Sequence, residues 1–282
     1  MINGSAIARP IAAAFARARA EGRVALIPYV MAGYPDAATS EALAVALGEA
    51  GADVLEFGIP FSDPLADGAT IQAASHHALE HGMTLAGALA IARRISARIA
   101  TPLVIMTSYN PIFSFGIARF CEAAREAGVA GLIVPDLPPE EAEPLQAAAV
   151  GCGIALVFLV TPTSPEARIE QVARLSKDSG GFIYCVSLSG VTGARERLPE
   201  HLAAFVGRVR ARTDLPLAVG FGVSRAEHVA EIGSIADGAV IGSALLNAVD
   251  AVASDDRVEA GVAFLRGLQA GAKAAGASSS AP

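Results

Sequence analysis

Short apolar segments alternate with helix-like segments eight times along this 282-residue chain. The helix-like segments carry apolar residues at helical spacing, whereas the apolar segments lack polar alternation, as is typical of parallel strands covered by helices. Eight such units in about 250 residues predict an α/β protein with one closed (β/α)8 barrel, a TIM barrel. A doubly wound open sheet is the alternative. The predicted strands are residues 24–31, 54–58, 103–107, 131–134, 155–160, 181–187, 217–220 and 238–241, and predicted helices include 36–50, 70–81, 84–99, 117–127, 199–212, 224–232 and one from Ser243.

The two ends of the chain lie outside the eight units. Residues 1–23 are amphipathic and predict an extra N-terminal helix, and the arginines and proline among them do not fit a signal peptide. Residues 271–282 are rich in Ala, Gly and Ser, a composition that predicts a disordered tail. We therefore expect a single barrel domain over residues 1–270.

Composition narrows the possible partners. The net charge of −7 argues against nucleic acid or an anionic membrane as the main ligand. The mean hydropathy is +0.47, but glycines and prolines interrupt the longest uncharged run, residues 144–165, so no membrane helix is expected. Cys121, Cys152 and Cys185 have no metal-ligand spacing, so we expect no metal site and a reducing, cytoplasmic location.

Residues 55–72, LEFGIPFSDPLADGATIQ, contain three carboxylates within twelve positions: Glu56, Asp63 and Asp67. Glu56 falls inside an apolar strand, where a carboxylate is costly unless it is paired or protonated. The loops that follow barrel strands carry the chemistry of this fold. The segment therefore predicts acid–base chemistry at the barrel mouth, and an acidic surface loop is the simpler alternative.

Three loops of small residues, 190–193, 220–224 and 242–243, follow the last three predicted strands. In a barrel they converge on one sector of the mouth, and the last opens a helix whose free N–H groups can bind phosphate without Lys or Arg. Tight turns without a ligand are the alternative. The predicted phosphate-binding residues are Gly193, Gly222, Gly242 and Ser243.

Six motifs occur in a fixed order: LEFGIPFSDPLADGATIQ, SYNPIFSFG, PDLPPEE, SGVTGAR, GFGVS and IGSALL. Through them the chain resembles the tryptophan synthase α subunit family from about residue 27 to residue 246. The resemblance implies a lyase of L-tryptophan biosynthesis that cleaves indole-3-glycerol phosphate to indole and glyceraldehyde 3-phosphate by a retro-aldol reaction. It implies no cofactor in this chain. Pyridoxal phosphate is expected only in a partner β subunit, within an α2β2 heterotetramer.

The resemblance also implies roles for individual residues. Glu56 would shuttle protons, and Asp67 would accept the indole N–H and stabilise positive charge on the ring. Tyr184 would contact the substrate as a third catalytic residue, unless it only packs the barrel. The substrate-binding residues would be Tyr29, Ile71, Met106, Thr192 and Phe221, and the residues facing the partner subunit would be Asp63, Pro64, Asn110 and Pro138.

Two other functions are possible from the sequence. One is another phosphate-binding barrel enzyme, such as a sugar-phosphate isomerase or aldolase. A Schiff-base aldolase needs a lysine on a strand, whereas Lys177 and Lys273, the two lysines, fall on a predicted helix and in the predicted tail. The other is a non-catalytic partner that only activates a β subunit, against which the presence of both Glu56 and Asp67 argues. Tyr34 and Leu188 depart from the family pattern outside the proposed chemistry.

Overall fold

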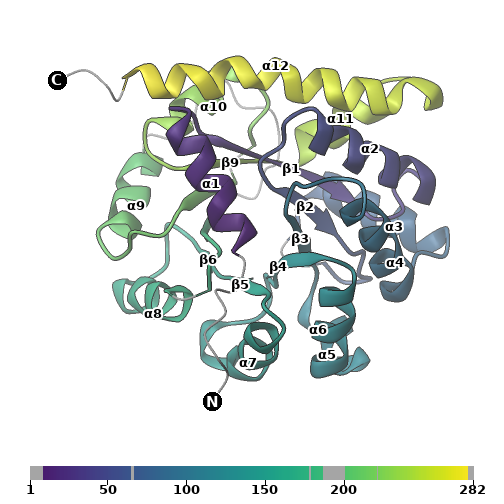
Figure 1. The fold of residues 1–282 in the computed structure, drawn as a ribbon, viewed down its shortest axis with the longest axis horizontal. Coiled ribbons are helices and arrows are strands. Elements are labelled where there is room, and N and C mark those ends of the chain that lie inside the picture. Colours follow the sequence, from purple (N-terminus) through teal and green to yellow (C-terminus); the bar gives the residue numbers. More distant parts are fainter. Residues whose placement is uncertain (1–8, 65–66, 178, 187–200, 221, 279–282) are drawn as a thin grey trace.

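The computed structural model describes residues 9–64, 67–177, 179–186, 201–220 and 222–278. In these ranges, nine parallel strands form one sheet in the order β5-β4-β3-β2-β1-β9-β8-β7-β6. The two edge strands, β5 and β6, are separated in the chain by Phe158 alone, so the sheet returns to its starting point and closes as a barrel (Figure 1). The strands are β1 (Ala25–Met31), β2 (Leu55–Gly58), β3 (Leu103–Met106), β4 (Val129–Ile133), β5 (Ala155–Val157), β6 (Leu159–Val160), β7 (Ile183–Val186), β8 (Leu217–Gly220) and β9 (Gly238–Ile241).

The predicted barrel is therefore confirmed, and the open sheet is excluded. The predicted strand 155–160 is divided into β5 and β6, which pair with β4 and β7 respectively. The described helices are α1 (Pro10–Ala20), α2 (Ala37–Glu49), α3 (Ala69–Glu80), α4 (Leu85–Ser96), α5 (Tyr109–Phe115), α6 (Ile117–Glu126), α7 (Glu143–Gly151), α8 (Glu166–Ser176), α9 (His201–Arg210), α10 (Ala226–Gly233), α11 (Ser243–Asp250) and α12 (Arg257–Ser278), with short 3-10 turns η1 (Pro139–Glu141) and η2 (Ser254–Asp256).

Side-chain caps explain where two of these helices begin. Asp36 accepts a hydrogen bond from the Thr39 N–H at the start of α2, and Thr84 accepts one from the Gly87 N–H at the start of α4. Each cap satisfies an N–H group that has no partner within the helix. Both starts agree with the sequence prediction.

Helix α1 closes the N-terminal end of the barrel (purple in Figure 1). Its buried residues include Ile11 and Phe15, which pack with the residues that point into the barrel. Phe15 lies 5.5 Å from Phe182 between ring centroids. A Cβ at Gly131 would come within 2.8 Å of Ile11, and one at Gly238 within 2.9 Å of Phe15. Two strand glycines therefore make room for the predicted N-terminal helix, which leaves the carboxyl ends of the strands as the open mouth.

Two segments differ from the sequence prediction. No helix was predicted between the strand 103–107 and the helix 117–127, but the structure has the helix α5 there. Helix α12 continues past Gly271, so the predicted start of a disordered tail at that residue is wrong, while residues 279–282 lie outside the described ranges. A Cβ at Gly271 would collide with the backbone carbonyl oxygen of Ala226 on α10, and Ala272 is buried. The small residues at this point therefore serve close packing between α12 and α10 rather than disorder.

None of the described helices is both long enough and apolar enough to cross a bilayer.

Candidate active site

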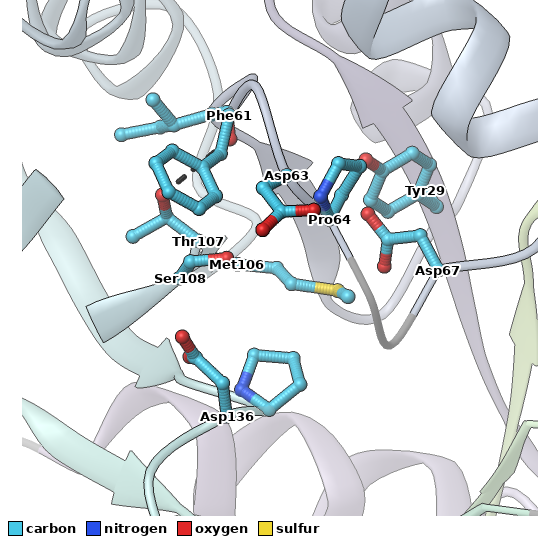
Figure 2. A pocket seen from close by; sticks show the side chains of 11 residues that line it. Tyr29, Phe61, Asp63, Pro64, Asp67, Met106, Thr107, Ser108 and Asp136 are labelled. Atoms are coloured by element: carbon cyan, nitrogen blue, oxygen red, sulfur yellow. Dashed lines mark hydrogen bonds between the residues drawn. The ribbon is translucent and has the colours of Figure 1, made fainter. Parts of the chain in front are cut away.

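A cavity opens at the mouth of the barrel, between the loops that follow β2, β3 and β4 (Figure 2). We call residues 59–68 loop 2 and residues 134–138 loop 4. Both loops start at the carboxyl ends of parallel strands, where barrel enzymes hold their reacting groups. The cavity is lined by Tyr29, Ile59, Phe61, Asp63, Pro64, Asp67, Met106, Thr107, Ser108, Pro135 and Asp136.

Glu56 lies on β2 between Tyr29 of β1 and Val104 of β3 in the strand register. Its neighbours Leu55 and Phe57 pack outward against the helices, so its own side chain points into the barrel. Glu56 is 1% exposed, and its Oε2 atom has no hydrogen-bond partner among the described residues. Burial, followed by the negative charge of Asp67, raises the pKa of Glu56 from 4.5 to about 8. The carboxyl group is therefore mainly protonated at neutral pH and can exchange a proton with a substrate.

Asp67 lies at the end of loop 2 and is half-buried. Gln72 of α3 holds the loop backbone, because its side-chain amide donates to the carbonyl oxygens of Asp67 at 2.8 Å and of Pro64 at 3.3 Å. Figure 2 shows the Asp67 carboxylate beside the Tyr29 ring, at the edge of the cavity. Burial, with the negative charge of Asp136 second, raises the pKa of Asp67 from 3.8 to about 6. Asp67 is thus mainly ionised at neutral pH, as an acceptor for an N–H group must be.

Tyr29 of β1 and Tyr184 of β7 both lie near Glu56 and Asp67. Burial raises the pKa of both hydroxyls well above 10, and the charges of Glu56 and Asp67 raise it further. Both tyrosines therefore stay protonated and lie within electrostatic reach of the two carboxyl groups.

Glycines make room for these two rings. A Cβ at Gly220 of β8 would lie 2.6 Å from the Tyr184 ring, and one at Gly58 of β2 would collide with the Tyr29 hydroxyl. Tyr184 also packs against Phe182, so its packing role and its position beside the carboxyl groups are both present.

An apolar cluster adjoins the carboxyl groups. Tyr29, Met31, Ala74 and Leu246 form its buried part, and Tyr34, Ile71 and Met106 pack against it. The predicted substrate-binding residues Tyr29, Ile71 and Met106 are therefore brought together from β1, α3 and β3. Thr192, Phe221 and the departure at Leu188 lie outside the described residues.

Of the predicted phosphate-binding residues, Gly222, Gly242 and Ser243 lie where β8 and β9 end side by side, Gly220 being opposite Val240. Gly222 has a φ of +63°, a left-handed conformation that favours glycine. Gly242 precedes α11, and no side chain caps the first turn of that helix in the described structure. Ser243 then contributes a partly exposed residue to the N-terminus of α11, which is suited to an anion. Gly193 lies outside the described residues.

Comparison with known proteins agrees with this geometry. The family model described as "Tryptophan synthase alpha chain" matches residues 15–273. The chain belongs to the tryptophan synthase alpha chain family. The alpha chain of Chloroflexus aurantiacus is 47% identical over 259 residues, covering 92% of this chain and 96% of that protein. The alpha chain of Roseiflexus sp. is 49% identical over 260 residues, covering 92% and 98%.

Solved structures give the same result. Tryptophan synthase of Mycobacterium tuberculosis superposes with a TM-score of 0.85 at 38% identity, covering 93% of this chain and 97% of that chain. The tryptophan synthase alpha chain of Legionella pneumophila gives a TM-score of 0.84 at 33% identity, covering 93% and 96%. As a member of this family, the protein is a lyase of tryptophan biosynthesis. It cleaves indole-3-glycerol phosphate in a retro-aldol reaction. Members of the family work with a beta subunit.

The residues predicted to face the beta subunit either line this cavity or lie within two residues of one that does. Asp63 is exposed on loop 2, Asn110 is exposed on α5, and Pro138 ends loop 4. Pro64 lines the cavity beside Asp63.

Two residues of α5 and loop 4 were not predicted from the sequence. Phe113 on α5 is 64% exposed, which is unusual for a large apolar side chain. Asp136 on loop 4 lines the cavity, and both of its carboxylate oxygens accept the Tyr109 N–H at the start of α5, at 2.8 and 3.1 Å. The position of Asp136 directly after a barrel strand was a usable signal, since Asp63 and Asp67 occupy the corresponding part of loop 2. Within the described ranges, no group of three His, Cys, Asp or Glu residues could hold a metal ion.

Proposed function

We propose that Glu56 and Asp67 carry the cleavage of indole-3-glycerol phosphate in this chain. The observation that supports this assignment is a buried carboxyl group with a pKa of about 8 beside a half-buried one with a pKa of about 6. Two carboxyl groups whose environments separate their pKa values can act as acid and base at the same pH. No cofactor is needed by this chain, and pyridoxal phosphate belongs to the beta subunit.

Glu56 supplies the proton transfers. Cleavage of the bond between indole C3 and the glycerol carbon requires a proton on C3 and the loss of a proton from the adjacent hydroxyl. Glu56 is protonated at neutral pH, gives its proton to C3, and as the resulting carboxylate takes the proton from the hydroxyl. The electron pair of the O–H bond forms the aldehyde, and the electron pair of the broken C–C bond restores the indole ring. Glu56 ends the cycle protonated.

Asp67 stabilises the intermediate. Protonation at C3 places positive charge on the indole nitrogen, and the carboxylate of Asp67 accepts the N–H and offsets that charge. Tyr184 lies within electrostatic reach of both carboxyl groups and stays protonated, so its hydroxyl can donate to the substrate glycerol chain. The indole ring is held by Tyr29, Ile71 and Met106.

The phosphate is held at the N-terminus of α11, by Gly222, Gly242, Ser243 and the glycine loop that includes Gly193. The experiment that tests the proposed function is incubation of the full chain with indole-3-glycerol phosphate, assayed for indole with and without a beta subunit. Indole is expected in both cases. In Ser243→Asp, a fixed negative charge replaces a hydroxyl beside the phosphate, and we expect KM to rise roughly tenfold or more.

The matched variant Ser243→Ala separates charge repulsion from loss of the hydroxyl. It removes one hydrogen bond and introduces no charge, so its KM should rise less than that of Ser243→Asp. Equal KM values in Ser243→Asp and the unsubstituted chain would contradict the phosphate site. Absence of indole with and without the beta subunit would contradict the function.

The beta subunit docks, in this proposal, on the rim made by loop 2, α5 and loop 4, and the complex is an α2β2 heterotetramer. Asp63, Pro64, Asn110 and Pro138 lie on this rim, and the exposed Phe113 adds an apolar residue on the same helix as Asn110. Exposed aromatic side chains surrounded by polar residues are typical anchors of protein interfaces. We place the protein in the reducing cytoplasm, in keeping with Cys121, Cys152 and Cys185, which are free.

Phe113→Ala is expected to weaken association with the beta subunit about tenfold, because the anchor loses its apolar contact area. Titration calorimetry with a purified beta subunit measures the dissociation constant. Val150→Ala is the matched control. Among the described residues Val150 is the other exposed large apolar one, 49% exposed, and it lies on α7 near Arg9, at the opposite end of the barrel. An unchanged constant in Phe113→Ala, or an equal change in Val150→Ala, would count against this interface.

A further inference from the structure

Asp136 caps a helix that belongs to a different loop. Helix α5 begins at Tyr109, and the preceding Ser108 makes no side-chain capping hydrogen bond. The cap comes instead from loop 4, where the Asp136 carboxylate accepts the Tyr109 N–H at 2.8 and 3.1 Å. A negative charge at a helix N-terminus is favourable, because it satisfies a free N–H and faces the positive end of the helix dipole. Loop 4 and α5 are therefore held together by this carboxylate.

The same carboxylate lies across the cavity from Asp67. Both residues line the cavity at the barrel mouth, and Figure 2 shows them on opposite sides of its opening. The charge of Asp136 raises the pKa of Asp67, second only to burial. Asp136 thus contacts the helix that carries Asn110 and Phe113 and acts electrostatically on the carboxylate that faces the substrate.

The other groups around Asp67 do not supply a comparable negative charge at neutral pH. Glu56 of β2 is mainly protonated, and Tyr29 of β1 and Tyr184 of β7 remain neutral. Asp63 of loop 2 is exposed, as is Asp136, but burial and the charge of Asp136 are what raise the pKa of Asp67. Among the described residues, Asp136 is therefore the charged group best placed to change the ionisation of Asp67.

We propose that Asp136 is a positioning residue through which the partner-facing helix α5 acts on Asp67. The inference rests on the proposed role of Asp67 in the cleavage reaction. When the Tyr109 N–H donates to Asp136, the peptide dipole at the start of α5 offsets part of the carboxylate charge. A displacement of α5 by the beta subunit changes that offset and so changes how readily Asp67 ionises. Partner binding at the rim would thereby be transmitted to the reaction without a direct contact.

The test separates the charge of Asp136 from its capping hydrogen bond. Asp136→Asn removes the charge but keeps a side-chain oxygen that can accept the Tyr109 N–H, whereas Asp136→Ala removes both. Glu141→Gln is the control, since Glu141 is an exposed carboxylate of η1 close to loop 4 in the chain. Two quantities are measured on the full chain. They are the pKa of the Asp67 carboxyl by ¹³C NMR titration without substrate, and the dissociation constant of the beta subunit.

Asp136→Asn should lower the pKa of Asp67 by roughly half a pH unit or more, because a neighbouring negative charge is gone. The acid limb of kcat should move to lower pH by the same amount. Asp136→Ala should show the same pKa change and, in addition, about threefold weaker association with the beta subunit, because α5 loses its cap. Glu141→Gln should change neither quantity.

An unmoved Asp67 pKa in Asp136→Asn, or an equal change in Glu141→Gln, would overturn the proposal. Equal association constants in Asp136→Asn and Asp136→Ala would overturn the part that concerns α5. The NMR titration needs no turnover, so it decides the link between Asp136 and Asp67 even if the role of Asp67 in catalysis proves wrong. That role fails separately if the Asp67 pKa moves in Asp136→Asn while the acid limb of kcat stays in place.

Discussion

Replacing Glu56 by glutamine is expected to lower indole release roughly 1,000-fold and, at about pH 8, to make the protein more stable than the unsubstituted chain. The loss of activity follows from the chemistry, because an amide of nearly the same shape cannot donate a proton to C3 and then remove one from the hydroxyl. The gain in stability follows from burial. Glu56 is 1% exposed, and its Oε2 has no hydrogen-bond partner among the described residues.

The sign of the stability change follows from the pKa of Glu56, which rises from 4.5 to about 8. Below pH 4.5 the folded and unfolded chains both hold the Glu56 proton, so this proton contributes no difference in stability between glutamate and glutamine. As the pH rises towards the higher value, the unfolded chain releases the proton while the folded chain keeps it, and the folded state loses relative stability. Glutamine does not titrate. The folded state of Glu56→Gln should therefore gain no stability over the unsubstituted chain near pH 4.5. Its gain should reach a few kcal/mol above about pH 8.

Thermal unfolding followed by circular dichroism across this pH range measures the effect. Glu49→Gln is a matched control, because Glu49 is exposed at the end of α2 and its replacement should leave the pH dependence unchanged. If Glu56→Gln and the unsubstituted chain lose stability in parallel as the pH rises, Glu56 is not held protonated by burial. Activity close to that of the unsubstituted chain would remove Glu56 from the mechanism.

Asp67→Asn is expected to lower kcat roughly 100-fold or more while leaving the binding of glycerol phosphate within about twofold. Asparagine can still accept the indole N–H through its carbonyl oxygen, but it carries no charge to offset the positive ring. The proposed phosphate contacts come from the ends of β8 and β9 and do not involve loop 2. Steady-state assays for indole and calorimetry with glycerol phosphate separate the two effects.

The pH dependence of kcat tests the role of Asp67 independently. Asp67 must be ionised to act, so kcat of the unsubstituted chain should fall as the pH drops through about 6. The acid limb should be absent from the residual activity of Asp67→Asn. Unaltered kinetics in this variant, or an acid limb that persists in it, would contradict the charge-stabilising role.

The eightfold alternation of apolar strand segments and helix segments in the sequence was sufficient to predict the barrel. Uninterrupted apolar strands such as 24–31 and the capping residues Asp36 and Thr84 set the local conformations, and these depend on neighbours in the chain. The misplaced tail boundary has the opposite origin. Gly271 lies in an Ala- and Gly-rich stretch typical of disorder, and its reason for being small is the Ala226 carbonyl of another helix. Local composition cannot distinguish flexibility from close packing.

Helix α5 shows the same limit. Its seven residues include Pro111, and the preceding Ser108 does not cap it, so the sequence of the segment predicts a loop. The capping group is Asp136, which follows the next strand of the barrel. A helix whose N-terminus is satisfied by a distant residue carries no start signal in its own sequence.

The sequence by itself determined the fold and the family, and it predicted Glu56 and Asp67 as the carboxyl groups of the site. An acid inside an apolar strand and an acidic loop after it are local patterns, and the family resemblance separated Asp67 from Asp63. Only the tertiary structure decided how these groups ionise. Burial and the charge of Asp67 raise the pKa of Glu56 to about 8, and burial and the charge of Asp136 raise the pKa of Asp67 to about 6. Desolvation and Coulomb energies depend on distances in space, and those distances exist only after the barrel has closed.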